Sequence, residues 1–142
     1  MSDLELMRLL NAAFRAEGRL NHQGPEAGTL PPRHKGHGRI LATLRNQGEL
    51  TQRELADRLE IRPQSLTTAL LNLEKAGLIR RRTNESDRRE TLVQVTPEGV
   101  ARCGEIEAIR GRTAETMLAD LTPEEKETLA GLLRRIVQAA ET

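Results

Sequence analysis

The chain has 142 residues, of which 37% are hydrophobic and 30% are charged, with one Phe, no Trp or Tyr and a single cysteine. This length suits one domain with an aliphatic core, and the lone cysteine excludes an internal disulfide framework. The N-terminus lacks the basic start and apolar run of a signal peptide, and no stretch holds the ~20 apolar residues that a membrane span needs. We therefore expect a cytoplasmic protein that does not contact the membrane.

The formal net charge of +1 conceals an uneven distribution along the chain. Residues 33–95 hold 13 Lys or Arg and 8 Asp or Glu, whereas the remaining residues hold 9 and 13. A basic middle between acidic ends indicates a segment that meets a polyanion, flanked by segments with another role.

The first part of the chain is expected to hold two helices separated by a long loop. Apolar residues recur at helical spacing from Leu4 to Phe14, which predicts an amphipathic helix over 3–17. Five glycines and three prolines predict a loop over 18–38. The apolar cluster that follows predicts a short second helix that ends near Gly48.

The middle of the chain has the pattern of a helix-turn-helix. Thr51 and Glu54 are spaced as a capping box, which predicts a helix over 52–59. After a short break, Pro63 suits the first position of another helix, which Gly77 ends. Two helices joined by three or four residues are typical of this DNA-binding motif.

The second helix of the motif carries short hydrogen-bonding side chains opposite its apolar stripe, where they can reach base edges. The exposed side of an ordinary surface helix is the alternative interpretation. Leu71 lies near the same side and has no assigned partner. The residues in and just before this helix that we expect to contact DNA are Arg62, Gln64, Ser65, Thr67, Thr68, Asn72 and Lys75.

A β-hairpin is predicted directly after the helix-turn-helix, because two strand-like runs, 78–82 and 91–95, flank a charged loop. Asp87 can orient the guanidinium of Arg88 or Arg89 by a bidentate bond, and a held arginine suits a narrow minor groove. A solvated strand face is the plainer interpretation of the strand arginines. The hairpin residues that we expect to contact DNA are Arg81, Arg82, Asp87, Arg88 and Arg89.

The stretch from Thr51 to Gly99 resembles the MarR family of bacterial transcriptional regulators. It contains the element LLNLEKAGLIR at residues 70–80 and the wing signature Asp87-Arg88-Arg89. The resemblance implies a homodimer that binds a palindromic double-stranded operator, most simply as a repressor. The recognition helices would enter successive major grooves, with Arg89 in the adjacent minor groove and Asp87 steering it.

The predicted fold is mainly α with a small β-hairpin, a winged helix-turn-helix within a single domain of residues 1–142. Residues 36–95 would bind DNA. A helix from Pro97 to about Ala119 and a last helix opened by Thr122 carry apolar stripes too long for one small winged domain to cover. We therefore expect the helices within 3–17 and 97–140 to pack against a second copy.

The resemblance also implies an effector pocket where the first, second and fifth helices meet. The long loop and short second helix depart from the family pattern, which leaves open whether any small molecule is sensed. The residues that would line the pocket are Leu10, Phe14, Ile40, Leu44 and Met117.

Other classes of function have weaker support in the sequence. Cys103 lies on an apolar stripe with no obvious cation beside it, which favours structural burial over a thiol switch. His34 and His37 could bind a metal or contact phosphates, but no further ligand has a recognisable spacing. No catalytic motif is present, so neither an enzyme nor a cofactor is expected. A winged helix that binds only an acidic protein surface remains the main alternative.

Overall fold

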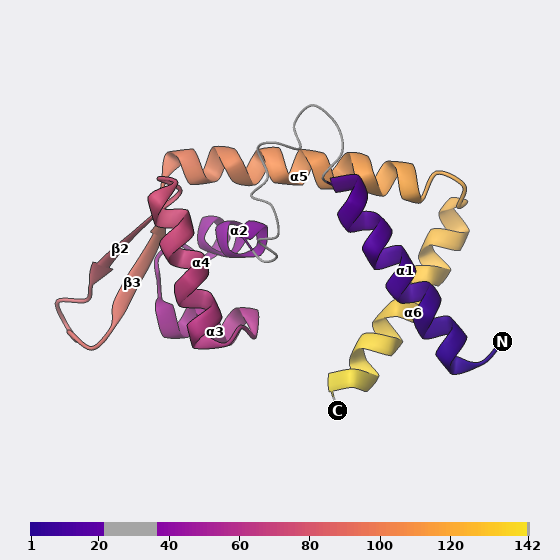
Figure 1. Cartoon of the computed structure of the whole chain (residues 1–142), viewed down its shortest axis with the longest axis horizontal. Helices are drawn as coiled ribbons and strands as arrows, with labels where there is room; N and C mark the ends of the chain where they lie inside the picture. The colour runs from indigo at the N-terminus through magenta and orange to yellow at the C-terminus, as the bar shows by residue number, and fades with distance from the viewer. Residues whose placement is uncertain (22–36, 142) are drawn as a thin grey trace. The chain divides into compact units, whose positions relative to one another are not determined.

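The structure is a computed structural model that describes residues 1–21 and 37–141. The chain divides into two compact units, one of residues 25–109 and one of residues 1–24 and 110–142. The mainly α architecture with a small antiparallel sheet confirms the predicted fold class (Figure 1). The elements in chain order are α1 (Asp3–Asn21), α2 (His37–Gln47), β1 (Leu50–Thr51), α3 (Gln52–Leu59), α4 (Pro63–Lys75), β2 (Ile79–Thr83), β3 (Thr91–Val95), α5 (Pro97–Met117) and α6 (Pro123–Glu141).

The helix-turn-helix is formed by α3 and α4 as predicted. The Thr51 hydroxyl accepts a hydrogen bond from the Glu54 N–H at 3.0 Å, and the Glu54 carboxylate accepts one from the Thr51 N–H at 3.4 Å. The turn contains no glycine, and Glu60 takes the left-handed conformation with φ of 53°. Pro63 then opens α4, where its missing N–H leaves no intrahelical bond unmade.

The sheet has three strands in the order β1-β3-β2, so the predicted hairpin gains an extra edge strand. Leu50 and Thr51 of β1 pair with Val93 and Leu92 of β3. Strand β1 was not predicted, because two residues carry no alternating pattern. Strand β2 begins and ends one residue later than predicted, at Ile79 and Thr83, which is within the ordinary uncertainty of strand ends.

The core of the 25–109 unit is aliphatic, as the composition predicted. It is shared by α2, α3, α4, the sheet and the first half of α5, and each fully buried Leu, Ile or Val contributes about 1.5–3 kcal/mol through the hydrophobic effect. The largest fully buried side chains are those of Ile40, Leu41, Leu44, Leu55, Leu66, Leu70, Leu73, Ile79, Val93 and Cys103.

The start of α5 is fixed to the end of α4. The Thr96 hydroxyl donates to the Gly77 carbonyl at 2.7 Å and accepts from the Gly99 N–H at 3.0 Å. Gly77, with φ of 77°, ends α4 as predicted. Gly99 lies so close to the preceding segment that a Cβ there would be 2.1 Å from the Leu78 carbonyl oxygen and 2.7 Å from Cγ2 of Val95.

The predicted loop over 18–38 was wrong at both ends. Helix α1 continues to Asn21, because a single Gly18 costs only about 1 kcal/mol relative to Ala and does not end the helix. Helix α2 begins at His37, where His37 and Gly38 are both buried. The rest of the predicted loop, residues 22–36, lies outside the described residues, as does His34.

Helices α1 and α6 have no buried residues, although both carry the periodic apolar residues that the sequence indicated. The capping box that opens α6 is present, with the Thr122 hydroxyl accepting from the Glu125 N–H at 3.1 Å. None of the described helices is long and apolar enough to cross a membrane. The large apolar side chains left exposed on the two helices are Leu4, Leu6, Met7, Leu9, Phe14, Leu129, Leu132, Ile136 and Val137.

Candidate nucleic-acid interface

The tip of the hairpin holds one arginine in a fixed orientation. The Asp87 carboxylate accepts hydrogen bonds from Nε and Nη2 of Arg89 at 3.1 and 3.3 Å, and from the Arg89 backbone N–H at 3.1 Å. These bonds lower the pKa of the Asp87 carboxyl, because they favour its charged form. The sequence left open which arginine Asp87 orients, and the structure places Arg89 there with 91% of its side chain exposed.

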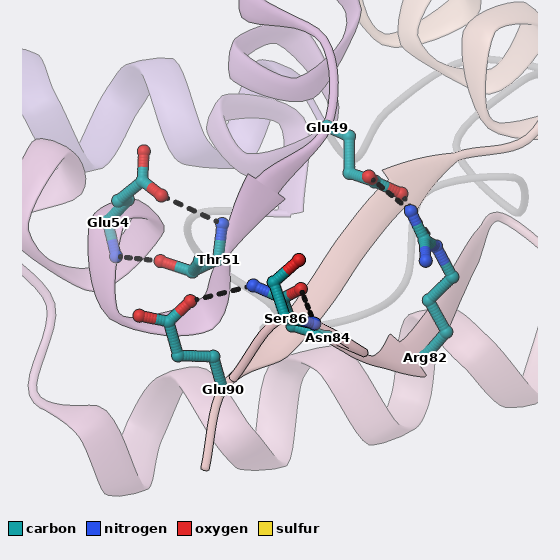
Figure 2. Close-up of polar contacts among 7 residues, drawn as sticks. All are labelled: Glu49, Thr51, Glu54, Arg82, Asn84, Ser86 and Glu90. Carbon is teal, nitrogen blue, oxygen red and sulfur yellow. Dashed lines mark hydrogen bonds and ion pairs between the residues drawn. The ribbon is translucent and has the colours of Figure 1, made fainter. Parts of the chain in front are cut away.

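The loop that presents Arg89 is closed by its own hydrogen bonds. The Asn84 side chain donates to the Glu90 carboxylate and accepts from the Ser86 N–H, both at 3.0 Å, as Figure 2 shows. The Asn84 N–H also donates to the Glu90 carbonyl at 3.0 Å. Hydrogen bonds between the two ends of the loop restrict the movement of its tip, so they help to hold Arg89 in position.

The strand arginines that were predicted to contact DNA are engaged within the chain. Arg81 donates to Glu74 of α4 at 2.9 Å, which lowers the pKa of Glu74. Arg82 donates to both carboxylate oxygens of Glu49 at 2.8 and 3.2 Å, and this raises the pKa of Arg82 (Figure 2). These pairs join the hairpin to α4 and to the residue before β1. DNA contacts by Arg81 and Arg82 stay predictions, and such contacts would have to compete with these pairs.

The side of α4 away from its buried leucines is open, as predicted. Leu71 is also exposed there, while Asn72 is half-buried. The Thr68 hydroxyl donates to the Gln64 carbonyl at 3.2 Å and keeps its lone pairs for another donor. The predicted contact residues that the structure exposes on and just before α4 are Arg62, Gln64, Ser65, Thr68 and Lys75.

Thr67 differs from the other predicted contacts because it faces α3. Its hydroxyl accepts a hydrogen bond from the Gln52 side-chain amide at 2.8 Å and donates to the Pro63 carbonyl at 2.9 Å. Gln52 was not among the predicted contact residues, although its polar side chain just after the helix cap at Thr51 is a signal in the sequence.

A groove of about 690 Å³ lies between the start of α3 and the hairpin. It brings Arg53 of α3 near Arg89, together with the carboxylates of Asp57, Asp87 and Glu90. The groove is therefore mixed in charge, which makes the orientation of individual donors important for any anion bound beside it.

Comparisons with known proteins agree with this arrangement. The family model described as "MarR family" matches residues 35–91. The multiple antibiotic resistance protein MarR of Salmonella typhimurium is 34% identical over 100 residues, which cover 70% of this chain and 69% of that protein. The chain belongs to the MarR family.

Two further MarR-family comparisons extend this result. The transcriptional repressor MdtR of Bacillus subtilis is 36% identical over 103 residues, covering 72% of this chain and 66%, just under two thirds, of MdtR. The crystal structure of a MarR mutant from E. coli in complex with operator DNA has a TM-score of 0.79 and 26% identity, with 93% of each chain covered. This MarR-family chain is a DNA-binding transcriptional regulator and not an enzyme.

Cys103 is buried on α5, in agreement with the structural role that the sequence favoured for it. The expectation that no cation lies near it was wrong. Arg45 of α2 donates to both oxygens of Glu107 at 3.1 and 2.7 Å, and the Cys103 sulfur lies 3.9 Å from the same carboxylate. Glu107 is the main cause of the raised pKa of Arg45, and Cys103 adds to it. The cation comes from another helix, so sequence spacing did not reveal it.

The metal site considered for His34 and His37 falls partly outside the described residues, which include His37 but not His34. His37 is buried at the start of α2 and not in a loop. Among residues 1–21 and 37–141, no three His, Cys, Asp or Glu side chains are grouped as metal ligands.

The effector pocket that the MarR resemblance implied stays a prediction. Ile40 and Leu44 are fully buried core residues of the 25–109 unit. Leu10, Phe14 and Met117 belong to the other unit, where Leu10 and Met117 are half-buried and Phe14 is exposed.

Proposed function

We propose that this protein is a homodimeric repressor that binds a roughly palindromic operator in double-stranded DNA. The observation that carries the proposal is the exposed Arg89, held by Asp87 at the tip of a hairpin that follows a helix-turn-helix. A minor groove with strong negative potential attracts an arginine presented in this way.

In the proposed complex, α4 lies in the major groove. Its exposed side chains, Gln64, Ser65 and Thr68, are hydrogen-bonding groups suited to base edges, while Arg62 and Lys75 suit phosphates. The hairpin then reaches the neighbouring minor groove with Arg89, and Arg88 is exposed beside it. Because the bacterial chromosome lies in the cytoplasm, we propose that the protein acts there.

The exposed apolar faces of α1 and α6 support the dimer. Apolar side chains at this spacing form a continuous stripe, which a second copy can cover by two-fold symmetry. We assign residues 36–95 to DNA binding and the helices within 3–17 and 97–140 to dimerisation. Two-fold symmetry would place operator half-sites about 34–36 Å apart. The relative named as a repressor and the neighbour solved with operator DNA support the same function.

Arg89→Ala is expected to weaken binding to every duplex and to flatten the dependence of affinity on salt. Each phosphate neutralised by a cation contributes about −0.9 to the slope of log affinity against log salt. Fluorescence titrations of labelled duplexes at several salt concentrations measure both effects. Arg110→Ala, which removes an exposed arginine of α5, serves as the control and should behave as the wild type.

The same titrations separate DNA binding from the alternative of a protein-binding winged helix. Wild-type affinity for duplex that falls steeply with salt supports the proposal. Duplex binding that is absent, or indifferent to salt, would reject it in favour of the protein-binding alternative.

Gln64→Ala and Thr68→Ala are expected to change sequence preference at a few base pairs, by about 1–3 kcal/mol for each lost contact. Selection of binding sites from random duplexes with the wild type and each variant measures this change and also gives the operator and its symmetry. Thr116→Ala is a matched control, because the exposed Thr116 hydroxyl also donates to the carbonyl four residues earlier, at 3.0 Å. If all four proteins select the same sequence, α4 does not read bases through Gln64 and Thr68.

A further inference from the structure

The side chain of Gln52 is fixed in direction by a chain of two hydrogen bonds. Thr67 donates its only hydroxyl hydrogen to the Pro63 carbonyl at 2.9 Å, so it can interact with Gln52 only as an acceptor. The Gln52 amide nitrogen must therefore be the donor in the 2.8 Å contact. This assignment turns the nitrogen of the carboxamide toward α4 and its oxygen away from Thr67.

The fixed amide retains hydrogen-bonding capacity. A carboxamide nitrogen carries two hydrogens, and Thr67 accepts one of them. The second N–H is carried by the same nitrogen, which the bond to Thr67 holds against α4. Gln52 is itself half-buried, and it lines the groove between the start of α3 and the hairpin.

The location of Gln52 indicates what this N–H would meet. Gln52 is the first residue of α3, the first helix of the motif. In a helix-turn-helix bound to DNA, the second helix occupies the major groove while the first helix crosses the sugar-phosphate backbone. An acceptor oxygen of a phosphate is the group that such a donor finds there.

The charges around Gln52 make a neutral donor useful. The adjacent groove contains Arg53 and Arg89 but also the carboxylates of Asp57, Asp87 and Glu90. Two arginines and three carboxylates give a formal charge of −1, so net charge does not attract a phosphate to this place. A directed hydrogen bond can fix the position of a phosphate where net charge does not.

We propose that Gln52 donates its second amide N–H to a phosphate of the DNA backbone, and that Thr67 is the positioning residue that holds this amide. The inference rests on the proposed DNA-binding function and deepens it by naming an anchor beside the recognition helix. Thr67 thereby moves from the predicted base contacts to a supporting role. The amide is oriented before DNA arrives, so little side-chain entropy is lost on binding.

Gln52→Ala is expected to lower the affinity for specific and non-specific duplex alike by about tenfold, the lower end of the range for a hydrogen bond to a charged group. Thr67→Val, which keeps the shape and removes the acceptor, should give a similar loss. The double variant should lose no more than Gln52→Ala alone, because the two residues act through one contact. Thr67→Ser keeps the hydroxyl, so in contrast to Thr67→Val it should bind duplex as the wild type does.

Two readouts distinguish this role from others. The salt slope should be unchanged in Gln52→Ala, because a neutral donor displaces no counterion, in contrast to Arg89→Ala. The sequence selected from random duplexes should also be unchanged. Gln138→Ala, which removes an exposed glutamine of α6 outside residues 36–95, is the matched control and should bind as the wild type.

Three results would overturn the inference. Wild-type affinity of Gln52→Ala would show that Gln52 makes no contact with the phosphate. A changed sequence preference would show that Gln52 contacts a base instead. Variants that lose stability in urea unfolding but retain full affinity would give the pair a purely structural role. In each of these cases the wild type still binds duplex. Failure of the wild type to bind any duplex would instead reject the proposed function as a whole.

Discussion

Replacing Leu133 and Ile136 together with glutamate is expected to convert the protein to monomers and to lower operator affinity by more than about 100-fold. Both residues lie on the apolar stripe of α6, where Ile136 is exposed and Leu133 half-buried within one chain. Two charges in a dimer interface lose their hydration without gaining partners. Each half-site would then be bound alone, without the high effective concentration that a linked second site provides.

Sedimentation velocity measures the mass of the double variant directly, and titration with the selected operator measures the loss of affinity. The control adds the same charge elsewhere on α6, with Thr128→Glu and Gln138→Glu at exposed positions away from the stripe. This control should remain a dimer. A Leu133/Ile136 variant with the sedimentation of the wild type would show that α6 is not the interface.

Gly99→Ala is expected to destabilise the fold by at least about 1–3 kcal/mol, the cost of forcing an extra carbon into a packed site. The added Cβ would lie 2.1 Å from the Leu78 carbonyl oxygen, which belongs to the backbone and cannot turn away as a side chain could. Relief requires the start of α5 to move from the end of α4, which would disturb the hydrogen bonds of Thr96.

Urea unfolding followed by circular dichroism gives the free energy of unfolding for this comparison. Gly104→Ala, on the same helix, is the matched control because a Cβ there meets nothing within 4 Å. It should stabilise α5 by about 0.5–1 kcal/mol, as alanine does in an open helical position. Equal stability of Gly99→Ala and the wild type would contradict the close approach at Leu78.

Local signals explain why so much of the DNA-binding part could be predicted from the sequence. The capping box at Thr51, the proline that opens α4 and the glycine that ends it act within one helical turn, so their spacing is sufficient. The same holds for Asp87 and Arg89, which are two residues apart and meet at 3.1 Å. The two ends of the helix-turn-helix and the bond between Asp87 and Arg89 could therefore be predicted from residues that are close in the sequence.

Contacts between segments that are far apart in the sequence could not be predicted from local patterns. The Gln52–Thr67 pair joins two helices, and the Arg45–Glu107 pair joins residues 62 positions apart. Strand β1 exists only because β3 supplies its hydrogen-bonding partners. In each case tertiary packing decides which side chains meet, and a periodic pattern contains no information about that choice.

Thr51 belongs to two structures at once. Its backbone pairs with Leu92 in the sheet, and its hydroxyl caps the first turn of α3. A movement of the hairpin away from its present position would therefore also strain the first turn of α3, so the hairpin and α3 should move together as one rigid body. In the proposed dimer, a signal that releases the protein from DNA would then more easily change the distance between the two DNA-binding parts than deform either of them.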